Sequence, residues 1–248
     1  MKPNRTQPSQ YSPAHHRVMN LFSTPFLRGH LPLNPKRIIS DIDTLVDQVA
    51  EKGGKDKLSD YTSYFDQEIR EATHRLGWFD EFADIMKDTY IEFIRTQFHR
   101  EVGHLSRHDI HLFAWINRYD SENQHDIHNH VDSYVSGTYY VNSSDRPIKF
   151  WNPNMAAQYA HNGREDKMEI DGHPNMDFTG CTGFQSEMYF HPTEGDFLLW
   201  PSYMMHSVPA ADTNDSSDRR YSISFNLKHN DPIMDNKTGN QYNYGEIF

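Results

Sequence analysis

The stretch RYSISFNL, residues 220–227, alternates polar and apolar side chains along its whole length. Successive side chains of a β-strand point to opposite faces of the sheet, so the stretch predicts a strand with one polar and one apolar face. The two sets are Arg220, Ser222, Ser224 and Asn226, and Tyr221, Ile223, Phe225 and Leu227. A polar stripe that faces inward and begins with arginine is unusual, and it indicates that this strand contributes to a site.

Strands of this kind fill the second half of the chain, after His108. Short runs rich in β-branched and aromatic residues are separated by turn residues: HLFAWINRY, SYVSGTYYV, IKFW, EMYFH and DFLLWP. In the first half, apolar residues recur at helical spacing from Asp41 to about Glu51 and from Tyr64 to about Val102. Helices followed by strands, without βαβ alternation, predict an α+β fold with an antiparallel sheet or barrel.

The same patterns divide the chain into parts. We expect a flexible arm at 1–20, a helical support region at 21–107, a β-rich core at 108–230 and a tail at 231–248. Within the core, residues 152–182 lack sustained periodicity, which predicts a long loop of the kind that often forms a lid or binding loop.

Composition excludes several classes of protein. At 248 residues the chain can bury enough surface that a metal is not needed to hold the fold, so a metal here would be functional. The net charge of −11 argues against a nucleic-acid partner. A single cysteine, Cys181, excludes an intramolecular disulfide and a Cys-rich zinc site. We find neither a signal-peptide pattern nor an apolar stretch of membrane-spanning length, so we expect a cytoplasmic protein without a membrane partner.

A cluster of metal-ligand side chains precedes the strand SYVSGTYYV. His128, His130 and Asp132 occupy alternate positions, so on an extended strand they would point into one cavity. Two histidines and a carboxylate on one face of a metal form the arrangement that non-heme Fe(II) oxygenases use. A further histidine, His206, follows the run GDFLLWPSYMM, in which Pro201 ends a buried strand and delivers His206 to its edge.

Arg220 provides a second kind of site. A buried guanidinium must be paired, and it suits a carboxylate bidentately, with the hydroxyl of Ser222 as an additional donor. Alternation along SGTYYV places Tyr140 where its phenol could reach the same carboxylate. These side chains predict an anchor for a dicarboxylate.

Taken together, these residues resemble the iron(II)- and 2-oxoglutarate-dependent oxygenases, whose core is a double-stranded β-helix, or jelly roll. The resemblance is closest to a subgroup of bacterial and phage proteins that is similar to prolyl hydroxylases. It spans residues 21 to 228 and depends on the runs LFSTPF, HNHVDSYVSGTYYV, IKFWNP and RRYSISFN and on the distal histidine run. It implies a jelly-roll core with N-terminal helices packed on the sheet.

The resemblance also implies roles for individual residues. His206 matches the distal iron ligand, Arg220 the residue that binds the far carboxylate of 2-oxoglutarate, Ser222 its helper and Tyr140 a co-substrate tyrosine. For the proximal ligands we prefer His130 with Asp132, because a carboxylate completes the triad. Members of the subgroup often have His-x-His instead, so His128 is the alternative to Asp132.

The activity implied is hydroxylation of a C–H bond at Fe(II), with 2-oxoglutarate and O₂ converted to succinate and CO₂. We expect a small-molecule, amino-acid or peptide substrate, and an exposed edge strand could support a homodimer. Trp115, Asn117, Trp151 and Asn152 are candidates for cavity lining. The loop at 152–182 would shape the substrate pocket.

Simpler interpretations exist for the same residues. With sixteen histidines, a chance His-x-His is plausible, and surface or turn positions are expected for His125, His161, His173, His191 and His229. Arg220 could form a structural salt bridge, Tyr140 could pack in the sheet, and the aromatic run 61–65 reads as core packing. Two other functions follow: a cupin-like metalloenzyme that uses His128, His130 and His206 without a keto acid, and a non-catalytic jelly-roll binding module.

Overall fold

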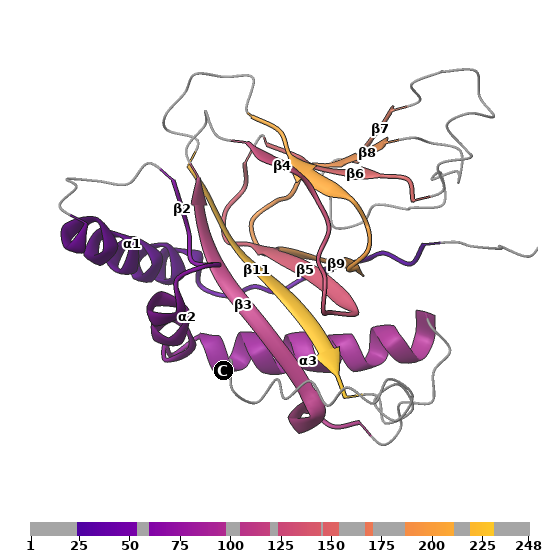
Figure 1. Ribbon diagram of the computed structural model, residues 1–248, viewed down its shortest axis with the longest axis horizontal. Coiled ribbons are helices and arrows are strands. Elements are labelled where there is room, and N and C mark those ends of the chain that lie inside the picture. The colour runs from indigo at the N-terminus through magenta and orange to yellow at the C-terminus, as the bar shows by residue number, and fades with distance from the viewer. Residues whose placement is uncertain are drawn as a thin grey trace, which may run out of the picture.

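Two β-sheets face each other, and helices cover the outer face of the larger one (Figure 1). The structure is a computed structural model, and it describes residues 24–53, 60–97, 105–119, 124–144, 146–153, 167–170, 187–210 and 219–230. The predicted arm at 1–20, the tail at 231–248, Cys181 and most of the predicted loop at 152–182 lie outside these residues.

The larger sheet has six strands, and its centre is made of long, fully paired strands. Its order is β1 (Leu27–His30), β9 (Asp196–Pro201), β5 (Val135–Tyr140), β11 (Arg220–His229), β3 (Ile110–Tyr119) and β2 (Tyr61–Thr62). All neighbours in this sheet are antiparallel, and Ser222 lies opposite Asn117 on one side and Tyr140 on the other. The predicted antiparallel sheet is therefore confirmed.

The smaller sheet has five strands and lies across the inner face of the larger one. Its order is β4 (His125–His128), β10 (His206–Val208), β6 (Ile148–Trp151), β8 (Glu187–Phe190) and β7 (Lys167–Ile170). From β3 to β11 the chain passes repeatedly between the two sheets, which is the winding of a jelly roll. Only the β7–β8 pair is parallel among the described strands.

The alternation in residues 220–227 has the predicted consequence. Tyr221, Ile223, Phe225 and Leu227 pack on the helix side, in the main hydrophobic core. A second, smaller core fills the space between the sheets, and it contains Tyr140, Ile148, Phe150, Phe190, Leu198, Trp200 and Met204. The polar members of β11 face this inner space, so the strand separates an apolar core from a polar cavity.

Three helices bury one face each against the larger sheet. They are α1 (Pro35–Lys52), α2 (Gln67–His74) and α3 (Phe79–Gln97). α1 begins where the Asn34 side chain accepts a hydrogen bond from the Arg37 backbone N–H, with Pro35 in the first turn. The run of helical spacing after Tyr64 is divided into two helices, and Asp66 caps the first of them. No helix in the described part of the chain is long and apolar enough to cross a membrane.

Three short strands were not predicted from the sequence. β1 and β2 lie in the helical half, and each adds an edge to the larger sheet. β7 forms inside the segment predicted as a long loop, so that prediction is wrong for residues 167–170. Strands of two to four residues leave little periodicity in a sequence, because their pairing partners, rather than their own pattern, determine them.

Candidate metal centre and anion pocket

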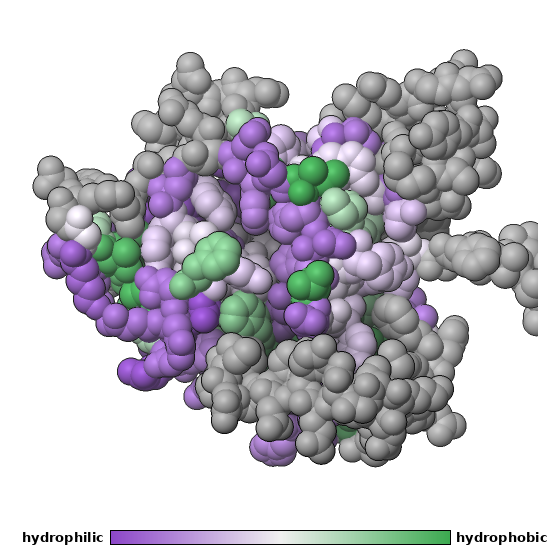
Figure 2. Space-filling view, in the orientation of Figure 1, coloured by the Kyte–Doolittle hydropathy of each residue, from purple (hydrophilic) through white to green (hydrophobic). Residues whose placement is uncertain are grey.

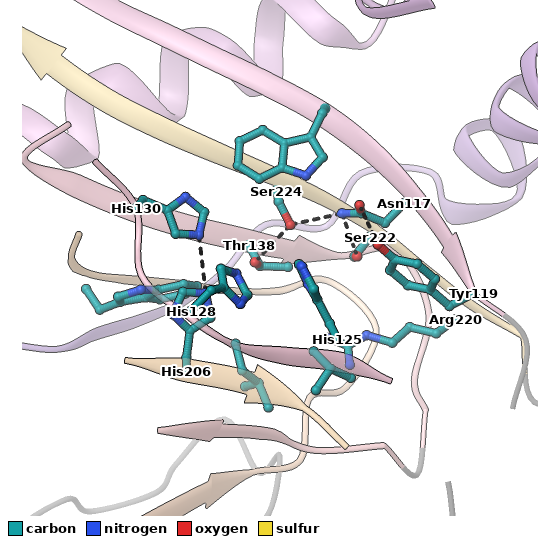
Figure 3. A pocket seen from close by; sticks show the side chains of 14 residues that line it. Asn117, Tyr119, His125, His128, His130, Thr138, His206, Arg220, Ser222 and Ser224 are labelled. Carbon is teal, nitrogen blue, oxygen red and sulfur yellow. Dashed lines mark hydrogen bonds between the residues drawn. The ribbon is translucent and has the colours of Figure 1, made fainter. Parts of the chain in front are cut away.

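A cavity between the two sheets collects the predicted polar residues (Figure 3). The larger sheet contributes one wall through β3, β5 and β11, and the smaller sheet contributes the other through β4 and β10. The lining side chains are Trp115, Asn117, Tyr119, His125, His128, His130, Thr138, Ile148, Trp200, His206, Val208, Arg220, Ser222 and Ser224. None of them is acidic, although the protein as a whole carries a net charge of −11.

Three histidines meet at one end of this cavity. His128 ends β4, His206 begins β10 directly opposite it, and His130 follows in the turn after β4. One nitrogen from each ring lies within 4.8 Å of the others, and the His130 and His206 Nε2 atoms are 3.3 Å apart. This spacing allows a single metal ion to contact all three imidazoles.

The outer nitrogens of the three rings are already occupied. His128 Nδ1 lies 2.7 Å from the Asp126 carbonyl oxygen, and His206 Nδ1 lies 3.0 Å from the Met204 carbonyl oxygen. A carbonyl only accepts, so both Nδ1 atoms carry the proton and both Nε2 atoms keep a free lone pair. Such outer hydrogen bonds fix the tautomer and ring orientation that metal binding needs.

For His130, a side chain rather than a backbone carbonyl accepts the hydrogen bond of the outer ring nitrogen. Its ring is hydrogen-bonded to Asn226, and because Nε2 faces His206, Nδ1 is the nitrogen left for this bond. Asn226 Oδ1 also accepts a hydrogen bond of 2.8 Å from Ser136, whose hydroxyl lies 2.8 Å from that of Ser202. The Ser202 carbonyl in turn accepts the His130 backbone N–H at 2.9 Å. A closed polar network therefore holds His130 in place.

The protonation state of the cluster also suits a metal. Burial is the main cause that lowers the pKa of His206 to about 2 and that of His130 to about 4, and neighbouring histidines lower both further. Burial also lowers the pKa of His128. The three imidazoles are thus neutral at neutral pH, which is the form that binds metal.

Asp132, which we preferred as a ligand, lies outside this cluster. β4 ends at His128, so the alternation that would have aligned three side chains does not continue. The chain then turns, and Asp132 itself has a φ of 60° with an exposed side chain. Within the described residues the group that could hold a metal consists of His128, His130 and His206, the set that includes the alternative ligand.

Arg220 lies at the other end of the cavity, and none of the described residues forms an ion pair with it. Its side chain is 2% exposed, and its Nε and Nη1 atoms have no hydrogen-bond partner among the same residues. The guanidinium packs over the Tyr140 ring at 5.0 Å, and the Tyr140 hydroxyl is buried beside it. Burial raises the pKa of Tyr140 to about 12, so this phenol remains a donor. Buried donors without acceptors are costly, so the pocket is built for an anion.

A polar floor connects the two ends. Asn117 Nδ2 donates to Ser224 Oγ at 3.0 Å, and its Oδ1 accepts from the Tyr119 hydroxyl at 3.2 Å. Thr138 Oγ1 lies 3.3 Å from the same Ser224 hydroxyl. Figure 3 shows these side chains between the histidines and Arg220. The structure therefore brings together His128, His130, His206, Arg220, Ser222 and Tyr140, but not Asp132.

Among the histidines expected at the surface or in turns, His229 is buried instead, and its Nδ1 lies 2.7 Å from the Tyr90 hydroxyl. His125 is exposed, as expected, but it also lines the cavity beside His128, with ring centroids 4.1 Å apart. Residues three apart on a regular strand face opposite ways, but the pairing of β10 with β4 shifts register between His206 and Val208. That bulge brings His125 to the cavity side, and no local pattern encodes it.

An aromatic surface adjoins the metal-ligand end of the cavity. Trp115 stacks on His130 at 5.7 Å, and Tyr64 contacts Trp115 edge-on at 5.0 Å. Phe113 and Phe65 extend the contacts from Tyr64 outward, and Phe65 is 89% exposed. The expectation that the run 61–65 packs in the core is therefore wrong for Tyr64 and Phe65. Figure 2 shows separate hydrophobic side chains among hydrophilic ones on one face of the molecule.

Comparison with known proteins agrees with the resemblance seen in the sequence. The model of a family described as putative 2OG-Fe(II) oxygenase matches residues 113–226, from β3 to β11. No curated protein sequence matches the chain. The family match agrees with the predicted superfamily over residues 113–226, and the two facing sheets have the winding of the predicted double-stranded β-helix.

Three solved structures illustrate the similarity. A Pseudomonas putida prolyl-4-hydroxylase is 12% identical, with a TM-score of 0.49 over 84% of this chain and 94% of that chain. HygX from Streptomyces hygroscopicus, solved with nickel and 2-oxoglutarate bound, is 12% identical, with a TM-score of 0.49 over 83% of each chain. The α-ketoglutarate-dependent epimerase SnoN from nogalamycin biosynthesis is 10% identical, with a TM-score of 0.47 over 82% of this chain and 78% of that chain.

Proposed function

We propose that this chain, whose residues 113–226 belong to the family of putative 2OG-Fe(II) oxygenases, is a 2-oxoglutarate-dependent hydroxylase of C–H bonds. One observation carries the proposal. A single cavity, whose described lining has no acidic side chain, holds three histidines with converging ring nitrogens at one end and, at the other, a buried guanidinium without an ion-pair partner in the described part of the chain. A metal ion and a dicarboxylate are the two partners that such a cavity lacks.

The ligand set that we propose is His128, His130 and His206. Each ring has its Nδ1 side held by an oxygen acceptor, so each can present Nε2 without reorganisation. Bound Fe(II) would supply O₂ activation, in which 2-oxoglutarate, O₂ and a substrate C–H bond give succinate, CO₂ and an alcohol. The side chains of the cavity bind, orient and shield these reactants.

Arg220 is the anchor that we propose for the far carboxylate of 2-oxoglutarate. Its Nε and Nη1 groups have no acceptor among the described residues, and the Tyr140 and Ser222 hydroxyls are further donors beside it. The keto-acid end of the molecule would then lie over the polar floor and reach the histidines. The alternative in which Arg220 forms a structural salt bridge is disfavoured because none of the lining side chains that the structure describes is acidic.

For the substrate we propose an amino acid, a peptide or another small molecule with an apolar ring. The aromatic surface formed by Tyr64, Phe65, Phe113 and Trp115 begins at His130, so a ring lying on it would be beside the metal. Aromatic faces pack well against saturated and unsaturated rings alike. Proline-containing peptides are therefore the first substrates to test.

The proposal is tested by measuring succinate formation from 2-oxoglutarate with added Fe(II) and O₂. Arg220→Ala should raise the KM for 2-oxoglutarate at least tenfold, since hydrogen bonds to charged groups contribute about 1.5–3 kcal/mol. Lys228→Ala is the matched control, because Lys228 is a cation on the same strand but does not line the cavity. Equal KM values for both variants would contradict the proposed anchor.

A second candidate is a cupin-like metalloenzyme that uses no keto acid. The observation in its favour is the ligand set itself, which contains three imidazoles and no carboxylate. It predicts that the protein binds Fe(II) without consuming 2-oxoglutarate and that Arg220→Ala leaves its metal-dependent activity intact. A binding module without catalysis predicts that Fe(II) does not bind at stoichiometric level.

A further inference from the structure

We propose that His125 donates a hydrogen bond to the same carboxylate that Arg220 binds, from the opposite wall of the cavity, and thereby makes the site selective for dicarboxylates. The inference rests on the proposed function and adds a residue that no motif identifies. His125 belongs to β4 in the smaller sheet, whereas Arg220 belongs to β11 in the larger sheet. A carboxylate between them would be held by both sheets.

The placement of His125 follows from the bulge in the β4–β10 pair. His125 lies opposite Val208 and His128 lies opposite His206, with a register shift between the two pairs. Both imidazoles consequently line the cavity, while Ile127 between them is 52% exposed. Bulges beside binding sites commonly re-aim a side chain in this way.

His125 is separate from the metal-ligand set. The three ring nitrogens that converge come from His128, His130 and His206, and His125 is not among them. Instead, Figure 3 shows the Arg220 side chain reaching toward the His125 ring, on the far side of His128 from His130. His125 thus lies between the histidine cluster and the guanidinium, beside the path of any molecule that connects them.

The number of donors near Arg220 explains why a second hydrogen-bond donor is useful. An ionised carboxylate offers about four lone-pair positions, and a neutral imidazole has one N–H to donate. Arg220 contributes the buried Nε and Nη1 groups, which lack partners. Among the described residues, the His125 ring makes no hydrogen bond of its own, so its N–H is available. Both sides of one carboxylate would then be satisfied.

Selectivity for dicarboxylates follows because a ligand with one carboxylate leaves the donors at the Arg220 end of the cavity without a ligand acceptor. A 2-keto acid with one carboxylate, such as pyruvate, could occupy the metal end but would leave the buried Arg220 without an acceptor and the exposed His125 with only water as a partner. A dicarboxylate of the length of 2-oxoglutarate satisfies both ends. Sites with buried polar groups discriminate strongly against ligands that leave those groups unpaired.

The test is anaerobic calorimetric titration of the Fe(II)-loaded full chain with 2-oxoglutarate and, separately, with pyruvate. We expect His125→Ala to weaken 2-oxoglutarate binding about tenfold, to change pyruvate binding little and to leave Fe(II) affinity unchanged. His125→Gln, which keeps an N–H donor, should recover part of the loss. Ile127→Ala, on the same strand but pointing outward, is the matched control and should match the wild type.

The outcomes separate the inference from the proposed function. If Arg220→Ala weakens 2-oxoglutarate binding and His125→Ala does not, the carboxylate anchor stands and the role of His125 is wrong. A fall in Fe(II) affinity in His125→Ala would make it a metal ligand and overturn the inference as well. Failure of the Fe(II)-loaded wild type to bind 2-oxoglutarate would overturn the proposed function itself.

Discussion

At the scale of single residues, hydrogen bonds to the outer ring nitrogens fix the tautomers of the three clustered histidines. The Nδ1 atoms of His128 and His206 face backbone carbonyls two residues earlier in the chain, so their own strands select the tautomer. His130 depends on the Asn226 side chain instead. The cluster therefore has two ligands fixed by the backbone and one fixed by a replaceable side chain.

The first prediction concerns the third ligand. His128→Ala should lower Fe(II) affinity by more than the 10- to 100-fold that loss of an outer-shell partner causes, because it removes a ligand. Asp132→Ala should leave the affinity close to the wild-type value, since Asp132 is exposed and lies outside the cluster. Competition with a metal-sensitive dye measures both. A larger loss in Asp132→Ala than in His128→Ala would restore the carboxylate as the ligand.

A second prediction concerns Asn226. Asn226→Ala removes the acceptor behind His130, so Fe(II) affinity should fall roughly 10- to 100-fold. Asn226→Asp keeps an oxygen acceptor at the same place and should restore most of the affinity. Asn129→Ala is the control, because Asn129 lies between the two ligand histidines but is exposed. Identical affinities in Asn226→Ala and Asn129→Ala would show that the His130 ring needs no such support.

The sequence predicted the orientation of those residues that lie on long, regular strands. Alternation along residues 220–227 predicted the face of β11 on which Arg220 and Ser222 line the cavity, and alternation in SGTYYV predicted the face of β5 on which Tyr140 lies beside Arg220, because β11 and β5 are continuous. It failed at Asp132, because β4 ends at His128 and the turn that follows cannot be read from alternation. His125 was missed for a related reason, since the bulge depends on how β10 pairs with β4.

At the scale of elements, close packing between neighbouring strands keeps the cavity wall rigid. Gly137 on β5 lies opposite Phe225 on β11 and Leu199 on β9. A Cβ atom at Gly137 would lie 2.4 Å from the Phe225 ring and 2.6 Å from the Leu198 carbonyl oxygen. The strand that carries Thr138 and Tyr140 into the cavity thus needs glycine at this point.

The third prediction follows from that packing. Gly137→Ala should lower the free energy of unfolding by about 1–3 kcal/mol, because the added methyl group overpacks the core. Gly53→Ala is the matched control, since its Cβ would be no closer than 3.4 Å to the Val49 carbonyl oxygen. Chemical denaturation of both variants measures the difference. Equal stabilities would mean that the Phe225 ring can move aside without cost.

The helices and long strands were predictable from the sequence, whereas the short edge strands were not. Asn34 and Asp66 cap their helices in the usual way, and β3 and β11 are long enough to display a period. β1, β2 and β7 have two to four residues each and are specified by the strands beside them. Their location depends on tertiary pairing, which local pattern does not contain.

At the scale of the whole molecule, an acidic protein encloses a cavity in which, among the described lining residues, the one fully charged side chain is a cation. The net charge is −11, yet this described lining contains Arg220 and four histidines and no carboxylate. The metal end is built from neutral imidazoles, so the full charge of a bound cation remains to attract an anion. This contrast suits the capture of a dianionic co-substrate.

The fourth prediction concerns pH. The pKa of His206 is lowered to about 2, and those of His125 and His130 to about 4, from an ordinary value of 6.5. The unfolded chain therefore binds protons below about pH 6.5 that the folded chain does not, so the stability of the metal-free protein should fall as the pH drops from about 6.5 toward 4. Thermal unfolding across this range measures the slope, and His206→Ala should make it shallower. An unchanged slope in His206→Ala would contradict the burial of a neutral imidazole there.

The central claim is that one cavity binds Fe(II) and 2-oxoglutarate together. The most direct measurement is an anaerobic titration of the full chain with Fe(II), before and after addition of 2-oxoglutarate, following the visible metal-to-ligand charge-transfer absorption of a chelated keto acid. We predict that this absorption appears only with both ligands, is absent in His206→Ala and needs far more 2-oxoglutarate in Arg220→Ala. Fe(II) binding without any such absorption would contradict the account and favour the cupin-like metalloenzyme.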